Sequence, residues 1–115
     1  MIELKNGVDL SNLLAPPMLE AVAALDRVFR LVGARCVITS GRDGVHMEGS
    51  KHYTGEALDF RLRHVSAEVG RAIVVILQEA LGAEFDVIFE EKNGVRWGHL
   101  EFDPPDLAPG GGDSV

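Results

Sequence analysis

The sequence predicts an α+β fold, in which two helices pack on one face of a small, mostly antiparallel sheet. Three observations support this prediction: two segments of helical period, several short segments of strand character, and an Asn-Gly turn signal between two of them. The 115 residues, 46% of them hydrophobic, suit one domain with one core. We expect this domain over residues 1–104 and a flexible, glycine-rich C-terminal tail over 105–115.

Both helices have clear boundary signals. The first is expected to begin at Pro16 and Pro17, because apolar residues then recur every three to four positions until Gly33 ends the pattern. The second is expected to begin after Ser66, which suits a helix N-cap, and to end near Gly82. Each helix has one apolar face, and these faces need a sheet to pack against.

Four segments are expected to form the sheet. Residues 36–39 form a short apolar strand, and residues 57–62 alternate strictly between core-facing and outward-facing positions. Residues 85–90 and 95–103 are expected to form a hairpin, since Asn93-Gly94 is the strongest short hairpin signal.

The alternation also predicts which side chains share a face. Asp59 and His99 are expected to project from the open face of the sheet, away from the helices. A two-residue turn pairs Glu90 with Trp97, which places Glu90 on the His99 side and diagonal to His99. Glu91 then lies on the opposite face, and a one-residue bulge would exchange the two glutamates.

Two imidazoles and a carboxylate are candidate metal ligands. His52, Asp59 and His99 with one water would make an open tetrahedral zinc site of the catalytic kind. Zinc lowers the pKa of its bound water to about 7, and a carboxylate is still needed to transfer the proton. Glu90 is placed for that role, and Ser50 could hydrogen-bond a metal ligand.

Several alternatives stay open. The base is one of Glu90, Glu91 and Glu101, the last because it shares the His99 face. Each candidate also has an ordinary reading as a polar loop or strand residue, although an Asp in the middle of an alternating strand is unfavourable unless it is paired or coordinated. The same ligands also suit Mn, Co and Ni.

A short motif resembles a known family. Residues Ser50, His52, Gly55, Ala57 and Asp59 fit the pattern Ser-x-His-x-x-Gly-x-Ala-x-Asp of the hedgehog/D-Ala-D-Ala peptidase family of zinc peptidases. The stretches 39–42 and 97–104 are similar to two further family segments, so that the resemblance spans about residues 36–104. The chain departs from the family in three places: the stretch 39–42 lacks the usual aromatic residue, Arg96 stands where many members carry the acid, and Trp97 replaces the first His of a His-x-His strand.

The resemblance implies a function. It implies a zinc metallopeptidase, with one Zn²⁺ on His52, Asp59 and His99 and with Glu90 as the base. The substrate would be a peptidoglycan stem peptide or muropeptide, cut by a D-Ala-D-Ala carboxypeptidase or by an endolysin-like L-Ala-D-Glu or cross-bridge endopeptidase. The candidate substrate-binding residues are Arg42, His46, Ser50 and Trp97. The alternative is a non-catalytic, zinc-stabilised protein-binding module of hedgehog type.

Composition limits the partners. The net charge of −7 argues against nucleic acid, because few cations are available to displace counterions from phosphates. No segment has the layout of a signal peptide or the length of a membrane span, so we expect synthesis in the cytoplasm. The protein would then act on muropeptides there, or on the cell wall after release, where a separate partner could supply wall targeting.

Overall fold

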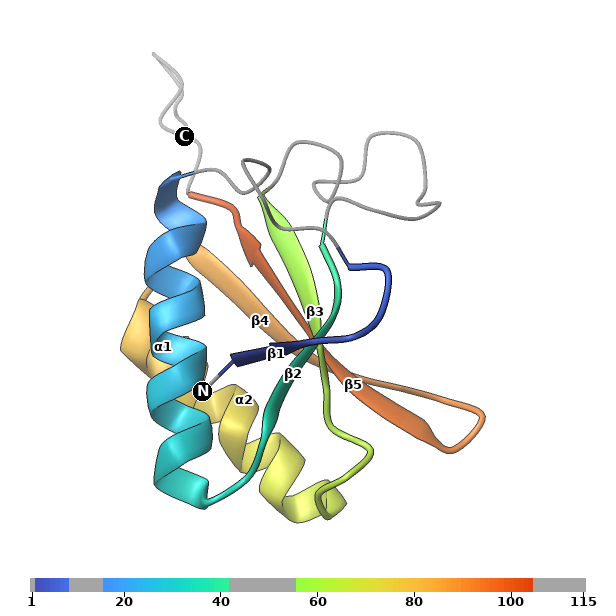
Figure 1. Cartoon of the computed structure of the whole chain (residues 1–115). Coiled ribbons are helices and arrows are strands. Elements are labelled where there is room, and N and C mark those ends of the chain that lie inside the picture. Colours follow the sequence, from blue (N-terminus) through green and yellow to red (C-terminus); the bar gives the residue numbers. More distant parts are fainter. Residues whose placement is uncertain (1, 9–15, 42–55, 105–115) are drawn as a thin grey trace.

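The computed structural model describes residues 2–8, 16–41 and 56–104. These residues form a five-stranded mixed sheet with two helices packed on one of its faces (Figure 1). In chain order the elements are β1 (Ile2–Leu4), α1 (Pro16–Val32), β2 (Cys36–Ser40), β3 (Ala57–Arg61), α2 (Ala67–Leu81), β4 (Phe85–Lys92) and β5 (Val95–Phe102). The predicted α+β class and the two helices on a sheet are therefore confirmed.

The strand order is β1-β2-β3-β5-β4, so that β3 and β5 lie side by side in the middle of the sheet. All neighbouring strands are antiparallel except β1 and β2, which are parallel. The sequence did not predict β1. This strand has only three residues, which is too short for a recognisable alternation, and its pairing with β2 comes from a distant part of the chain.

The helix boundaries lie where the sequence places them. Helix α1 is followed by Gly33, whose φ of 74° is the left-handed conformation that ends many helices. At the start of α2, the Ser66 hydroxyl accepts a hydrogen bond from the Val69 N–H at 3.1 Å. At its end, the Gly82 N–H donates to the Gln78 carbonyl at 2.9 Å. No helix in the described ranges is long and apolar enough to cross a membrane.

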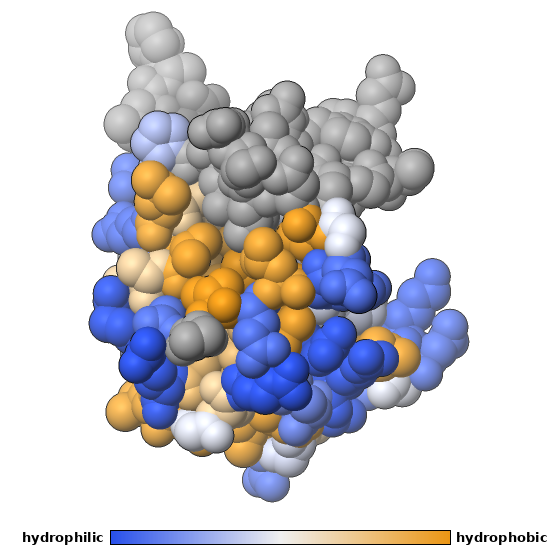
Figure 2. Space-filling view, viewed as in Figure 1, coloured by the Kyte–Doolittle hydropathy of each residue, from blue (hydrophilic) through white to orange (hydrophobic). Residues whose placement is uncertain are grey.

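One core lies between the helices and the sheet. The Phe29 ring of α1 meets the Phe60 ring of β3 edge to face, with centroids 5.9 Å apart. The largest side chains that are almost fully buried are Phe29, Phe60, Met18, Leu25, Ile38, Leu58, Leu62, Ile73, Leu77, Leu100 and Cys36. On the side shown in Figure 2, apolar side chains gather near α1, and hydrophilic ones surround the β4–β5 hairpin. The core fixes which face of β3 and β5 points away from the helices.

The β4–β5 hairpin has the predicted register. Glu90 lies opposite Trp97, and the turn residues Asn93 and Gly94 have φ values of 54° and 79°. Two consecutive positive φ values define the tight turn whose twist matches that of the flanking strands. The bulge that would exchange Glu90 and Glu91 is absent from this described hairpin.

Gly98 sets the contact between the two central strands. It lies opposite Phe60, and a β-carbon at this position would overlap the Phe60 ring. The ring therefore covers the glycine backbone directly, and the neighbouring residues of β5 keep their register against β3.

We predict that Gly98→Ala lowers the free energy of unfolding by about 1–3 kcal/mol, because the added methyl group forces the Phe60 ring out of its rotamer. Chemical denaturation would measure the change. The double variant Gly98→Ala/Phe60→Leu should lose less stability than the sum of the two single variants. Strict additivity of the two losses would contradict this contact as the cause.

Candidate functional site

Asp59 and His99 face each other across the two central strands. They are register partners in β3 and β5, and His99 Nδ1 lies 2.8 Å from Asp59 Oδ1. Each side chain is 21% exposed, on the face of the sheet that the helices leave open. The structure thus brings together two of the three residues that the sequence proposes as metal ligands, although 40 positions separate them in the chain.

Glu101 holds the other side of the His99 ring. His99 Nε2 lies 2.9 Å from Glu101 Oε1, so the imidazole sits between two carboxylates. The hydrogen bond to Asp59, followed by the one to Glu101, raises the pKa of His99 to about 9 against the opposing effect of burial. Without a metal the ring is therefore an imidazolium at neutral pH, and both of its N–H groups donate.

The donor set suits a divalent metal. A metal-bound histidine commonly donates its second ring N–H to a carboxylate, which orients the ring and raises its basicity. Glu101 stands in that position relative to His99 Nε2, while Nδ1 and the Asp59 oxygen point at each other. The 2.8 Å between Nδ1 and Oδ1 is a hydrogen-bond distance, so these two atoms could share a metal only after the proton between them has left.

The other predicted site residues divide into two groups. His52, Ser50, His46 and Arg42 lie outside the described residues. Trp97 is half-buried on the open face, one position before Gly98.

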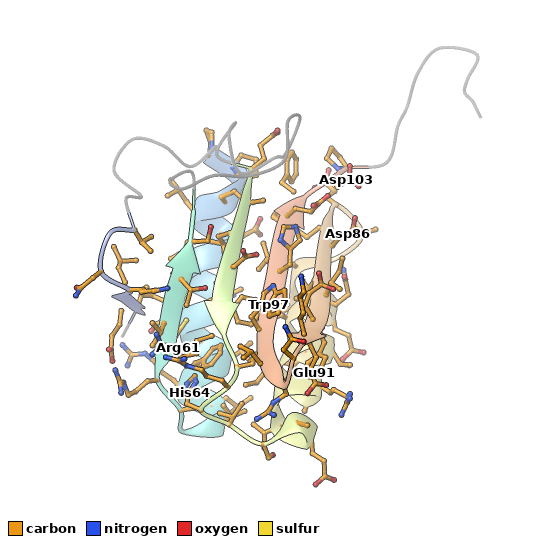
Figure 3. All side chains as sticks on the ribbon, turned by 90° about the vertical axis from the view of Figure 1, so that its right-hand side faces the viewer. Arg61, His64, Asp86, Glu91, Trp97 and Asp103 are labelled. Carbon is orange, nitrogen blue, oxygen red and sulfur yellow. The ribbon has the colours of Figure 1, made fainter. Side chains whose placement is uncertain are left out.

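The three candidate bases have different surroundings. Glu90 is exposed, lies opposite Trp97 and is diagonal to His99, whose own partner on β4 is Ile88. Glu91 is the register partner of Arg96, and the alternation along β4 places it on the face opposite Glu90. Figure 3 shows it near the turn of the β4–β5 hairpin. Glu101 is bound to the His99 ring. Of these three glutamates, Glu90 is the one that lies on the open face and makes no hydrogen bond to the imidazole.

An acidic cluster adjoins the pair, and sequence reasoning missed it. Carboxylate oxygens of Asp86, Glu101 and Asp103 all lie within 4.8 Å of one another. Asp86 and Glu101 are register partners in β4 and β5, and Asp103 follows the end of β5. Burial, followed by the hydrogen bond with Asp103 and the neighbouring carboxylates, raises the pKa of Asp86. The hairpin register already pairs Asp86 with Glu101, so this juxtaposition was available from the sequence.

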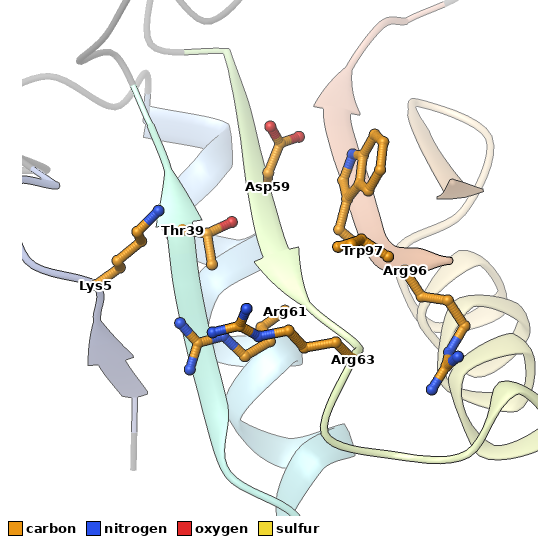
Figure 4. A pocket seen from close by; sticks show the side chains of 8 residues that line it. Lys5, Thr39, Asp59, Arg61, Arg63, Arg96 and Trp97 are labelled. Carbon is orange, nitrogen blue, oxygen red and sulfur yellow. The ribbon is translucent and has the colours of Figure 1, made fainter. Parts of the chain in front are cut away.

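A pocket of about 280 Å³ opens on the other side of Asp59 (Figure 4). It is lined by Asp59, Trp97, Thr39, Val95 and four cationic residues, Lys5, Arg61, Arg63 and Arg96. The alternation of β3 already places Arg61 on the Asp59 face, but Lys5 comes from the segment after β1, which the sequence did not predict as part of the sheet.

No model of a known protein family matches this chain, and neither does any curated protein. The functional assignment therefore depends on the residues of the open face and on the motif that precedes β3.

We predict that Asp86→Asn raises the melting temperature at pH 7. A carboxyl group whose pKa is raised by folding costs stability once it ionises, and an Asn amide can still donate to Asp103. The folded state keeps the Asp86 proton to a higher pH than the unfolded state does. The destabilisation by Asp86 therefore appears above the usual aspartate pKa and vanishes in acid.

Thermal unfolding between pH 3 and pH 7 would measure the difference, which should shrink as the pH falls. The control is Glu79→Gln on the exposed face of α2, which removes the same charge away from the cluster. An equal shift in both variants would show a general effect of net charge instead.

Proposed function

We propose that this protein is a zinc-dependent peptidase that hydrolyses an amide bond in peptidoglycan stem peptides. The observation that carries the proposal is the Asp59–His99 pair at 2.8 Å on the open face, with Glu101 behind the imidazole. The Ser-x-His motif ends at Asp59, so His52 is the natural third ligand. Three ligands leave one position for water, as in catalytic zinc sites.

His52, Asp59 and His99 would hold the metal. When bound, zinc supplies a Lewis acid that polarises a carbonyl oxygen and lowers the pKa of water. Asp59 supplies negative charge on one side of the imidazole, and Glu101 accepts from Nε2–H, which leaves the lone pair of Nδ1 for the metal. Glu101 is in this view a positioning residue, because its contact is with the ligand and not with the substrate.

Glu90 is the proposed general base. It would take a proton from the attacking water and pass it to the leaving amine, which requires a carboxylate that reaches the open face. The β4–β5 hairpin extends the sheet on the Trp97 side and presents Glu90 from there. The cleaved bond is a D-Ala-D-Ala, an L-Ala-D-Glu or a cross-bridge amide, in the cell wall or in soluble muropeptides.

We predict that Glu101→Gln weakens zinc binding by about tenfold, since the amide still accepts from His99 but no longer stabilises the positive charge behind it. Competition with a chromophoric chelator would measure the dissociation constant. Glu79→Gln, with the same loss of charge on α2, should bind zinc as the unchanged protein does. Equal zinc affinity in the unchanged protein and both variants would show that Glu101 has no role in metal binding.

We predict that Glu90→Gln abolishes hydrolysis and leaves the zinc content unchanged, because the amide cannot take a proton. Mass spectrometry of digested muropeptides would measure turnover, and elemental analysis would measure zinc. Glu20→Gln on the exposed side of α1 is the matched control.

The outcomes separate the candidates. Unchanged turnover in Glu90→Gln would discard this base, and loss of turnover in Glu91→Gln would assign the role to that residue. Zinc-loaded protein that binds stem peptides and cleaves none of their bonds would favour a protein- or peptide-binding module over a peptidase.

A further inference from the structure

Cations are concentrated in one pocket of this acidic chain. The whole sequence has 11 Lys and Arg residues against 18 Asp and Glu. Four of those cations line the pocket beside Asp59. Such a gathering of like charges is unfavourable, because neighbouring positive groups repel each other. Asp59 is the one carboxylate of this lining, and its Oδ1 is already bonded to His99.

One of the four cations, Arg96, already has a protein partner. Arg96 donates from Nη2 to the Val65 carbonyl at 2.7 Å, and its register partner in the hairpin is Glu91. Figure 4 shows its guanidinium directed away from Arg61 and Arg63. The aliphatic part of the Arg96 side chain thus lines the pocket wall. Its guanidinium group binds the Val65 carbonyl in the loop before α2.

The guanidinium groups of Arg61 and Arg63 turn to the same side, toward β2 (Figure 4). Within the described residues, no carboxylate forms an ion pair with either of them. The nearby Glu3 is held by Arg35 through two hydrogen bonds of 2.9 and 2.7 Å, and its electrostatic interaction with Arg61 is weaker than that with Arg35. Lys5 lines the same pocket from the segment after β1 and adds a third positive charge.

One end of the pocket lies at the Asp59–His99 pair. Asp59 is at once a wall of the pocket and the partner of His99, so a ligand that fills the pocket ends at the proposed metal centre. Trp97 forms another wall, and its ring offers a flat apolar surface to a peptide backbone. A ligand with negative charges at one end and an amide bond at the other fits this layout.

We propose that this pocket binds the carboxylates of an acidic segment in a peptide ligand, with Arg61 and Arg63 as the main contacts and Lys5 as the third. Arginine suits carboxylates because its planar donors bind both oxygens at once. The proposal deepens the proposed function, on which it rests for the position of the cleaved bond. It assigns the specificity of the site to charged side chains flanking that bond.

The test uses Trp97 fluorescence, since this is the only tryptophan of the chain and it lines the pocket. The probes are two blocked peptides without terminal charges, acetyl-Ala-Glu-Glu-Ala-amide and acetyl-Ala-Gln-Gln-Ala-amide. Zinc-free full-length protein is titrated with each. We expect the glutamate peptide to bind at least about tenfold more tightly than the glutamine peptide. Added salt should reduce this difference.

Three variants make the test specific. Arg61→Gln/Arg63→Gln should reduce the preference for the glutamate peptide to less than about twofold. Arg61→Lys/Arg63→Lys keeps the charge and should retain part of the preference, which guards against a variant that merely unfolds. Arg27→Gln removes an exposed cation from α1 and should bind as the unchanged protein does.

Equal binding of the two peptides, or an unchanged preference in the glutamine double variant, would overturn the proposal. Tighter binding of inorganic phosphate than of the glutamate peptide would also overturn it, in favour of a phosphate ligand. Because the titration needs neither zinc nor turnover, its failure is distinct from failure of the proposed peptidase. If the protein cleaves stem peptides at rates that do not depend on their charge, the proposed peptidase activity would stand and the proposed acidic subsite would be wrong.

Discussion

The contact between the Phe60 ring and the Gly98 backbone is the constraint on which the site depends. It joins the helix-covered core to the one position of β5 that has no side chain. Since side chains alternate along a strand, fixing Phe60 over Gly98 also fixes Asp59 opposite His99 on the other face. A slip by one residue would bury the imidazole under the helices and turn Leu100 to solvent, so the core and the site enforce the same register.

Much of this arrangement could be predicted from local sequence signals. The Ser66 cap, the Gly33 end of α1 and the Asn93-Gly94 turn are each determined by residues close in the chain, and all three lie where the sequence places them. The pairing of Asp59 with His99 needed more, because alternation gives the face of each strand but not its neighbour. That β3 lies next to β5, with the hairpin partner β4 at the edge, is a property of the whole sheet.

The features that escaped prediction share a physical cause. Strand β1 is held mainly by its pairing with β2, and Lys5 reaches the pocket only because of that pairing. The role of Glu101 likewise depends on side-chain geometry, since residues two apart on a strand share a face but need not touch. Long-range contacts of this kind leave little trace in the hydrophobic period of a short segment.

Charge on the open face is divided along the sheet. Glu101 lies on one side of His99, with Asp86 and Asp103 next to it, and the guanidinium groups lie beyond Asp59 on the other side. Proton and metal compete for the same nitrogen of His99, and Asp59 stabilises either occupant, so the carboxylates alone do not choose between them. A third ligand changes this balance, because it binds a metal but gains nothing from a proton on Nδ1. In the proposed site His52 would be such a ligand, and it would favour the metal over the proton at Nδ1.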